Sequence, residues 1–283
     1  MNKLDDALAA SYTRVEGRRE RGIDRVLKLF AYLNGAGRPV RLAELPKALG
    51  APRSTIYELV TTLGQSGLLE ISGDDNKVYF GRAMHLYGMS YFRENDLVRR
   101  GSAEVDALSI MTGESSELCM LNRNLQAIVH AHPGTRPMRI SSEVGSQIPL
   151  PWTASGRMLL SHMSRDEIRA LVRPEDLILP DRRVVDVEAF IDDCHAARGK
   201  NLVVTEGLIN SFAQCLASPI LGVNGEVQAT ICLVLPIDTT ERQRTAMQNH
   251  LIASSRRLSL HSSPSTAGAI VVASTGSNTS FTP

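Results

Sequence analysis

The chain has 283 residues, and at roughly 100–200 residues per domain this length predicts two domains. Apolar residues make up 43% and charged residues 22% of the chain, so most of it should fold. The net charge is only +1, but residues 14–82 contain 12 Lys or Arg and 8 Asp or Glu. This local basic excess indicates an anionic partner for the N-terminal end alone.

Signals for export or membrane insertion are missing from the sequence. The N-terminus lacks the apolar core of a signal peptide, and no window approaches 18 uninterrupted apolar residues. The cysteines lie far apart and form no CxxC motif: Cys119, Cys194, Cys215 and Cys232. We therefore expect a cytoplasmic protein with reduced thiols and no membrane partner.

The N-terminal part combines a polar arm with a helical pattern. Residues 1–20 are polar and mixed in charge, and we expect a flexible arm there. Residues 21–82 then follow the order helix, helix, tight turn, helix, hairpin. The first helix should bury one apolar face, formed by Ile23, Val26, Leu27, Phe30 and Leu33.

A Gly-Pro corner at residues 50–52 separates the second and third helices. The third helix should bury the apolar stripe of Ile56, Leu59, Val60 and Leu63. The strands "LLEI" and "KVYF" then enclose a polar turn. This order is typical of a winged helix-turn-helix domain, whose second helix of the pair lies in the major groove with its N-terminal residues against base edges.

Polar side chains at the start of that helix and near it are the candidate DNA contacts. Arg can pair with guanine, Ser and Thr can bond bases or phosphates, and the free N–H groups of a helix start favour phosphate. The predicted DNA-binding residues are Arg38, Arg41, Arg53, Ser54, Thr55, Tyr57, Glu58 and Lys77. Alternatively, Ser54 or Thr55 only caps the helix, and Glu58 only pairs with a surface Arg.

The remaining chain divides into a linker, a second domain and a tail. Residues 83–98 are predicted to form a linker helix that pairs two subunits or packs within one chain, with an apolar side of Leu86, Met89, Phe92 and Leu97. Another helix is expected from about Leu97 to Thr112. Short strands alternate with amphipathic helices through residues 99–261, which indicates an α+β domain. The tail, residues 262–283, is rich in Ser, Thr and Gly and is expected to be disordered.

Four stretches spread over residues 22–261 carry a family pattern. They are "GIDRVLKLF", "LAELPKALGAPRSTIYELVTTLGQSGLLE", "VGSQIPLPWTASGRMLL" and "ARGKNLVVTEG" followed by "CLASPILGVNGEVQATICLVLP". Together they resemble the IclR family of bacterial transcriptional regulators. The resemblance implies an N-terminal winged helix-turn-helix domain, a linker helix and a C-terminal GAF-like effector-binding domain with an antiparallel sheet. It also implies a homodimer or homotetramer that represses or activates a catabolic operon in response to a small organic molecule.

The resemblance further implies an effector pocket between the sheet and the loop before the "TASG" helix. Backbone N–H groups at that helix start would hold a carboxylate, so the expected effector is an organic acid. The implied effector-binding residues are Trp152, Ala154, Ser155, Gly156, Glu206, Cys215 and Cys232.

Trp152 marks a departure from the family pattern. It is the only Trp in the chain, and Pro151 and Trp152 stand where many members have His-Ala. Trp152 lines a pocket for an aromatic or larger apolar effector, or it packs in the core or in an interface. A second departure, "TEGLINSFAQC", lacks the usual second acidic residue, so the polar contacts to an effector stay open.

We expect no catalytic residue, cofactor or metal. Cys194 and His195 adjoin on a helix, where neighbours point about 100° apart, so they do not form a nucleophile–base pair. Walker, GxGxxG, GxSxG and HExxH motifs are absent. Conceivable zinc ligands, none with the spacing of a metal site, are His130, His132, Cys119 and Cys232.

The sequence therefore predicts a ligand-responsive DNA-binding transcription regulator in which an effector shifts the geometry of a dimer. Its partners would be a double-stranded DNA operator, a small organic acid and further copies of the chain. One alternative is a constitutive DNA-binding protein whose C-terminal domain serves only oligomerisation. Another is an enzyme with a DNA-binding appendage, which the absence of nucleophile–base spacings disfavours.

Overall fold

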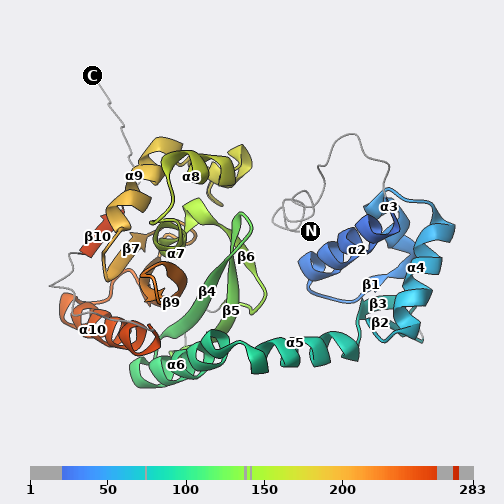
Figure 1. Cartoon of the computed structure of the whole chain (residues 1–283), viewed down its shortest axis with the longest axis horizontal. Coiled ribbons are helices and arrows are strands. Elements are labelled where there is room, and N and C mark those ends of the chain that lie inside the picture. Colours follow the sequence, from blue (N-terminus) through green and yellow to red (C-terminus); the bar gives the residue numbers. More distant parts are fainter. Residues whose placement is uncertain (1–20, 74, 137–138, 141, 260–269, 274–283) are drawn as a thin grey trace. The chain divides into compact units, whose positions relative to one another are not determined.

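The chain divides into two compact units, Met1–Glu94 and Asn95–Pro283 (Figure 1). The computed structural model describes residues 21–73, 75–136, 139–140, 142–259 and 270–273. The expected flexible arm, residues 1–20, lies outside the described residues. Over the described residues, no helix is long and apolar enough to span a bilayer.

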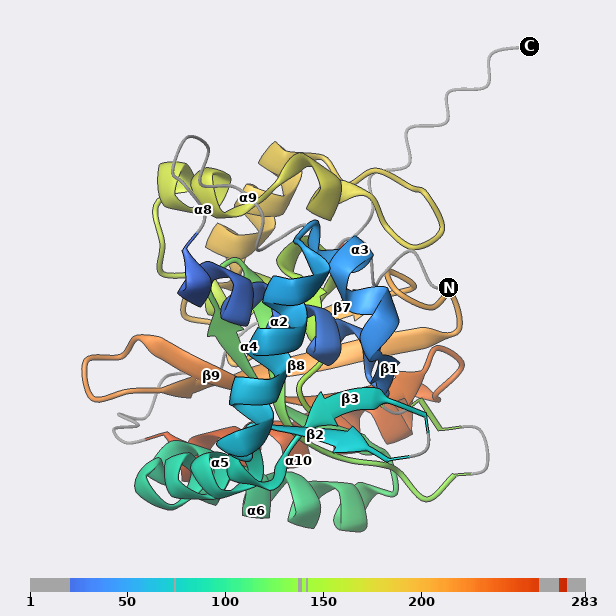
Figure 2. The same ribbon diagram turned by 90° about the vertical axis from the view of Figure 1, so that its right-hand side faces the viewer.

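The first unit is a winged helix-turn-helix domain, as predicted. Its elements are α2 (Gly22–Ala36), β1 (Val40–Arg41), η1 (Leu42–Glu44), α3 (Leu45–Leu49), α4 (Arg53–Gln65), β2 (Leu69–Ser72), β3 (Lys77–Phe80) and α5 (Arg82–Glu94). The antiparallel strands lie in the order β1-β3-β2, and the β2–β3 hairpin follows α4 (Figure 2). Gly50 ends α3 at φ 61°, a left-handed conformation that glycine adopts without steric cost.

The core of this unit confirms the stripe predicted for α4 but not the whole face predicted for α2. Ile56, Val60 and Leu63 are buried. On α2, however, Ile23 is 66% and Leu27 is 47% exposed. The buried side of α2 instead runs through Val26, Leu29, Phe30 and Leu33. Apolar residues surround more than one face of this helix, so periodicity alone selected the wrong edge.

The predicted linker helix is interrupted. It was expected over residues 83–98, but α5 ends at Glu94 and Asn95 begins a new helix, α6 (Asp96–Thr112). The Asn95 side chain accepts a hydrogen bond from the Val98 backbone N–H at 3.0 Å, which satisfies one of the unpaired donors at the helix start. The boundary between the two units along the chain therefore falls at the N-cap of α6.

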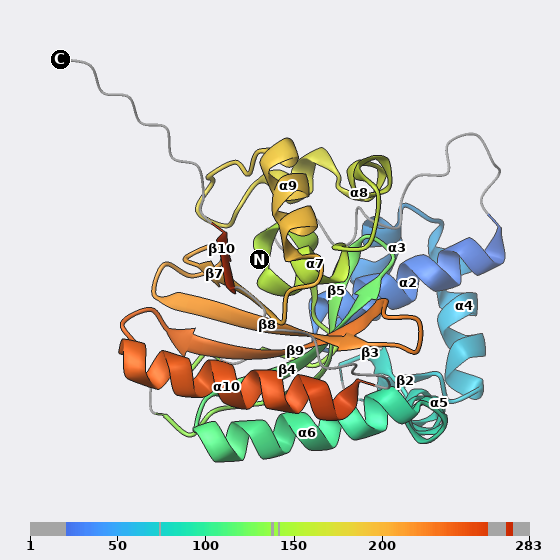
Figure 3. The ribbon, with the colours of Figure 1, turned by 60° about the vertical axis from the view of Figure 1, so that its left-hand side comes forward.

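The second unit consists of a mixed helix-and-strand domain. Besides α6 it contains β4 (Ser115–Asn122), β5 (Leu125–His132), β6 (Gln147–Pro149), η2 (Leu150–Trp152), α7 (Ala154–Leu159), α8 (Arg165–Leu171), η3 (Pro174–Leu177), α9 (Val187–Ala197), β7 (Leu202–Glu206), β8 (Ala213–Leu221), β9 (Val227–Pro236), α10 (Glu241–Leu258) and β10 (Ile270–Ala273). The sheet order is β10-β7-β8-β9-β4-β5-β6. Helices α6 and α10 lie side by side against one face of this sheet, and α7 and α9 lie on the other (Figure 3).

Strand alternation assigns neighbouring residues to these two faces. Leu118, Leu216 and Ile231 belong to the core under α6 and α10. The next residue along β4 and β9 in each case, Cys119 and Cys232, belongs to the core under α7. Because successive side chains of a strand point to opposite faces, the sheet is covered on both sides and its strands are rich in apolar residues.

One strand differs from the sequence expectation for the tail. Ile270–Ala273 lie within residues 262–283, expected to be disordered, yet they form β10. This strand pairs in parallel with β7, whereas the other described pairings in the sheet are antiparallel. The short "AIVV" run is the only apolar stretch of that tail, and β-branched residues favour such pairing.

Candidate functional site

The start of α4 leaves its polar side chains available. The N-cap residue is Pro52, which makes no side-chain cap, so neither Ser54 nor Thr55 acts as the N-cap. Ser54 is exposed and Thr55 is half-buried. Within the described part of the chain, neither hydroxyl makes a hydrogen bond. The structure thus disfavours the capping alternative for these two residues.

Arg53 is held by an aromatic neighbour one helical turn away. Its Nη2 donates to the Tyr57 Oη at 2.9 Å, and its guanidinium carbon lies 5.0 Å from the centre of the Tyr57 ring. Stacking on an aromatic face reduces the rotamer freedom of the guanidinium. The pair presents an oriented, exposed Arg at the first turn of α4, which suits bidentate recognition of a base.

The predicted cations of the hairpin are partly engaged by an acid. Lys77 Nζ lies 2.5 Å from Asp75 Oδ2. The hydrogen bond from Lys77 and the charge of Arg41 both lower the pKa of the exposed Asp75 carboxyl. Arg38 is exposed, and its Nη1 donates only a long 3.5 Å hydrogen bond to the Pro39 carbonyl. Asp75 therefore competes with DNA phosphate for Lys77 and Arg41, two of the predicted DNA contacts.

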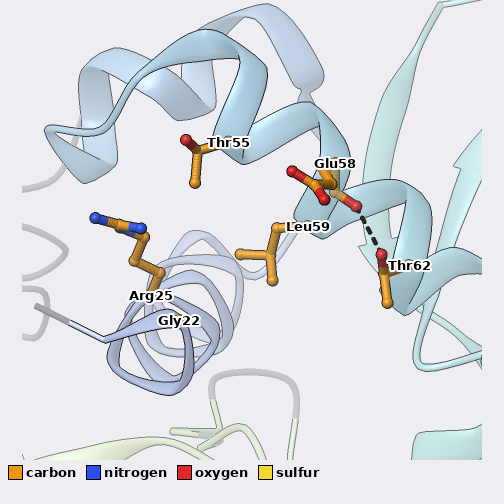
Figure 4. Close-up of a pocket in the computed structure, with 6 residues that line it drawn as sticks. All are labelled: Gly22, Arg25, Thr55, Glu58, Leu59 and Thr62. Carbon is orange, nitrogen blue, oxygen red and sulfur yellow. Dashed lines mark hydrogen bonds between the residues drawn. The ribbon is translucent and has the colours of Figure 1, made fainter.

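A pocket of about 200 Å³ lies in the first unit, between the start of α2 and one side of α4 (Figure 4). Thr55 and Glu58 line it together with Leu59. Arg25 borders it from α2. These two predicted DNA contacts thus lie on the side of α4 that faces α2, while Arg53 and Ser54 lie outside this pocket.

A second pocket, of about 220 Å³, lies in the second unit. Trp152 and Cys215, two of the residues predicted to bind the effector, line it. Its apolar lining comes mainly from Ile140, Ile148, Leu208, Ile209 and Val234. Its polar lining consists of Glu117, Gln126, Ser142, Thr153, Thr205 and Asn210. This is the candidate effector pocket.

Trp152 is fixed in this wall by the loop that carries it. Its Nε1 donates to the Asp176 carbonyl at 2.8 Å, and the side chain is only 9% exposed. The buried Arg157 of α7 donates from Nη1 to the carbonyls of Pro151 and Thr153 at 3.1 and 3.0 Å. Its Nε donates to Asp193 Oδ2 at 3.0 Å. Pocket lining and packing are therefore both roles of Trp152.

The expected carboxylate nest at the "TASG" helix is filled by the protein itself. The Gly156 N–H donates to Thr153 Oγ1 at 2.8 Å, which is an N-cap hydrogen bond. The Ser155 hydroxyl is fully buried and lies 2.8 Å from Cys232 Sγ and 3.0 Å from Thr230 Oγ1. Ala154 and Gly156 are also buried, and none of the three is part of the pocket wall.

Close packing against Leu150 explains why position 156 is a glycine. A Cβ at this position would lie 2.0 Å from the Leu150 carbonyl oxygen. Only glycine therefore allows this close approach of α7 to the backbone of η2. The motif that suggested an anion site instead serves a tight helix–loop contact.

Two further residues implied by the resemblance lie away from the pocket. Cys232 is fully buried behind the wall, under α7. Glu206 is half-buried, and its Oε1 lies 3.7 Å from Arg244 Nη1 of α10. Neither belongs to the lining residues. The hydrogen bond with Cys232 and burial raise the pKa of the Cys215 thiol well above its usual range.

Glu117 is a pocket residue that sequence reasoning missed. It lies on β4, directly opposite Cys232 of β9, and is only 5% exposed. Burial, followed by the charge of Cys232, raises the pKa of its carboxyl to about 7. The signal in the sequence was an acid directly before the apolar run "LCML" of a predicted strand. Burying a carboxyl in such a strand without a counter-charge costs folding free energy, so its presence there indicates a functional role.

The conceivable zinc ligands have other partners. His130 Nε2 lies 2.8 Å from Asp106 Oδ1, and His132 Nδ1 lies 3.1 Å from Ser109 Oγ. Both partners belong to α6, so the two rings pack against that helix. No group of three or more His, Cys, Asp or Glu suited to a metal occurs among the described residues.

Two family models match the chain. The model described as "Bacterial transcriptional regulator IclR C-terminal" matches residues 89–260, and the "IclR helix-turn-helix domain" matches residues 22–72. The HTH-type transcriptional regulator BhcR of Paracoccus denitrificans is 24% identical over 249 residues, which cover 86% of this chain and 88% of BhcR.

Solved structures have the same fold. An IclR transcriptional regulator from Alicyclobacillus acidocaldarius matches with a TM-score of 0.74 and 18% identity, covering 86% of this chain and 98% of that one. An IclR homologue from Microbacterium hydrocarbonoxydans, complexed with 4-hydroxybenzoate, matches with a TM-score of 0.67 and 22% identity over 84% of this chain and 97% of its own. The chain thus belongs to the IclR family of bacterial transcriptional regulators, a family that is not enzymatic.

Proposed function

We propose that the chain is a ligand-responsive DNA-binding regulator of a catabolic operon. The start of α4 supports this proposal most directly. Arg53 is exposed there and stacks on Tyr57, and the neighbouring Ser54 and Thr55 hydroxyls do not cap the helix. Recognition by such a helix places its first turn against base edges. We also expect the protein to act in the cytoplasm, because its operator would be there.

The proposed contacts divide by task. Arg53, with Ser54, would read bases, whereas Arg38, Arg41 and Lys77 would hold phosphates. Thr55 and Glu58 would act only if DNA approaches the side of α4 that faces α2. Phosphate contacts make binding fall steeply as salt rises.

Effector control requires linkage between the two units. In a dimer, two recognition helices must match half-sites about one helical turn, or a multiple of it, apart. An effector that binds one arrangement of the dimer better than another shifts the spacing of these helices, by no more than its differential affinity allows. The pocket of about 220 Å³ behind Trp152 supports this reading over a constitutive DNA-binding protein.

Two observations concern the chemical class of the effector. The relative from Microbacterium hydrocarbonoxydans is complexed with an aromatic acid, 4-hydroxybenzoate. In this chain, the nest that would bind a carboxylate is occupied by Thr153. The proposal therefore keeps a small organic effector in this pocket and drops the acid-binding role of Ala154, Ser155 and Gly156.

Arg53→Ala tests the DNA-binding half. DNA selected from a random library with the wild-type protein serves as the operator. The variant should bind it about 1–3 kcal/mol more weakly and with relaxed preference at one base pair. Arg256→Ala, which removes an exposed Arg of α10 in the other unit, is the matched control and should bind normally. Equal affinities of all three proteins in a gel-shift titration would contradict the proposal that the start of α4 contacts the bases of DNA.

A further inference from the structure

We propose that Glu117 determines the specificity of the effector pocket and selects a molecule that presents a hydrogen-bond donor to it, such as a hydroxyl, amide or amine, rather than a carboxylate. This inference rests on the proposed function, because it assumes that an effector binds in this pocket. It names a residue and a ligand class outside the carboxylate nest implied by the resemblance.

The hydrogen bonds of Glu117 leave acceptor capacity for a ligand. Its Oε1 accepts a hydrogen bond from the Ser142 hydroxyl at 2.6 Å. Among the described residues, its Oε2 accepts only from the weak thiol donor of Cys119, at 3.8 Å. An ionised carboxylate has about four acceptor sites on its two oxygens. A strong donor from a ligand would therefore complete a group that the protein satisfies only in part.

No cation offsets this acid. Among the described residues that line the pocket there is no Lys, Arg or His. The titratable groups that act on Glu117 from the packed strands are thiols: Cys119 on β4 and Cys232 on β9. Cys215 on β8 is the third thiol of the cluster. A ligand carboxylate would thus be buried beside a second carboxyl without a counter-charge, which weakens its binding.

The neighbouring amide is already oriented. Gln126 Oε1 accepts from Thr153 Oγ1 at 2.6 Å, and its Nε2 donates to Cys119 Sγ at 3.2 Å. Gln126 therefore has little freedom to turn and meet a carboxylate. The pocket volume of about 220 Å³ equals the liquid volume of about seven waters, so the effector is small.

Trp152 provides the readout of binding. It is the only Trp in the chain, and it lines this pocket. We would titrate the wild-type protein with two probes of the same shape, benzamide and benzoate, and follow Trp fluorescence; only the amide carries a hydrogen-bond donor at pH 8. At pH 8 the amide should bind at least tenfold more tightly than the acid.

The acid probe should also bind with a defined pH dependence. It can bind only beside protonated Glu117, whose pKa of about 7 makes the protonated fraction fall about tenfold between pH 6 and pH 8. The Kd of benzoate should rise by about the same factor. The Kd of the neutral amide should change far less. This series needs no variant, so it stands even if a substitution impairs folding.

Glu117→Gln removes the charge at constant shape and can still accept the Ser142 hydrogen bond. It should bind benzoate about tenfold more tightly than the wild type at pH 8 and lose the pH dependence. Glu143→Gln changes the net charge equally at an exposed residue outside the pocket wall and should behave like the wild type.

The outcomes separate this inference from the proposed function. Equal binding of both probes by the wild type at pH 8, or unchanged acid binding in Glu117→Gln, overturns the role of Glu117 and leaves effector binding intact. If neither probe alters Trp152 fluorescence at millimolar concentration in the wild type or in Glu117→Gln, both the inference and the effector-binding role fail.

Discussion

The buried Glu117 carboxyl makes the stability of the fold depend on pH. Its pKa is raised from 4.5 to about 7, so between these values the folded state binds more protons than the unfolded state. The free energy of unfolding should therefore fall as pH rises from about 4.5 to about 7, by up to about 3 kcal/mol. Urea unfolding of the wild type at pH 5 and pH 8 measures this loss.

Glu117→Gln isolates this contribution. The variant should lose less stability than the wild type between pH 5 and pH 8, and at pH 8 it should be the more stable protein. Glu143→Gln, at an exposed position, should follow the wild type. A variant less stable than the wild type at pH 8 would mean that the buried charge is better satisfied than its two partners, Ser142 and Cys119, indicate.

The Asp75 carboxylate should lower the affinity of the protein for DNA. It is exposed and bonds Lys77, and the charge of Arg41 also acts on it. Asp75→Asn removes the acid and frees both cations for phosphate. Affinity for DNA of any sequence should increase, and the plot of log K against log salt should steepen by about 0.9 for each phosphate gained. Fluorescence anisotropy at several salt concentrations tests this, with Glu143→Gln as control. An unchanged slope would contradict it.

Individual pocket residues were the hardest feature to predict. The family resemblance implied that Cys215 and Cys232 line a pocket, but only Cys215 reaches it because α7 covers Cys232. The position of a helix over a sheet is set by packing that a sequence pattern does not contain. For the same reason Glu117 remained unnoticed, since it looks like an ordinary strand residue until the segment at Ser142 and the residue Trp152 enclose it in the pocket.

Helix α7 shows how an element supports the pocket. Arg157 is buried and joins the loop before α7 to Asp193 of α9. Its side chain also lies over the Phe190 ring, with 5.2 Å between the guanidinium carbon and the ring centre. The loop that carries Trp152 is therefore attached to two helices through one side chain.

Arg157→Leu should destabilise the second unit by about 3 kcal/mol, because it leaves the Asp193 carboxylate and two loop carbonyls without their donor. The emission maximum of Trp152 should shift to longer wavelength as its loop loosens. Arg198→Leu, at an exposed Arg that also bonds loop carbonyls, should cost about 0.5 kcal/mol. Equal losses in both variants, measured by urea unfolding, would show that burial of Arg157 contributes nothing.

Elements with strong patterns were predicted well, and their ends less so. The order of helices and strands in the winged domain follows from apolar periodicity, the Gly50 corner and the polar turn before Lys77. The break at Asn95 was expected at about Leu97, slightly too late, because an Asn within this segment looks like a surface residue. An N-cap is recognised by backbone geometry, which the apolar spacing does not report.

At the scale of the whole molecule, we propose that α5 mediates self-association. None of its residues is buried, and Leu86, Tyr87 and Met89 are 61%, 64% and 50% exposed. A helix with an uncovered apolar side needs a partner surface. Because the chain alone provides one recognition helix per copy, pairing of two copies would also explain how two half-sites are read.

Leu86→Glu should weaken this pairing. We expect a lower apparent mass by analytical ultracentrifugation at micromolar concentration and at least a tenfold loss of operator affinity, since a monomer reads only one half-site. His85→Glu introduces the same charge at an exposed polar position of the same helix and serves as control. If Leu86→Glu sediments like the wild type, α5 does not form the interface.

The C-terminal segment has a consequence for the handling of this protein. Strand β10 occupies the outer side of β7, so β7 is not the boundary of the sheet. A shortened version that stops at residue 259 would leave a row of unsatisfied amides and carbonyls along β7. Such a version invites strand addition from a neighbouring molecule, and trimming this terminus to aid crystal growth would promote aggregation instead.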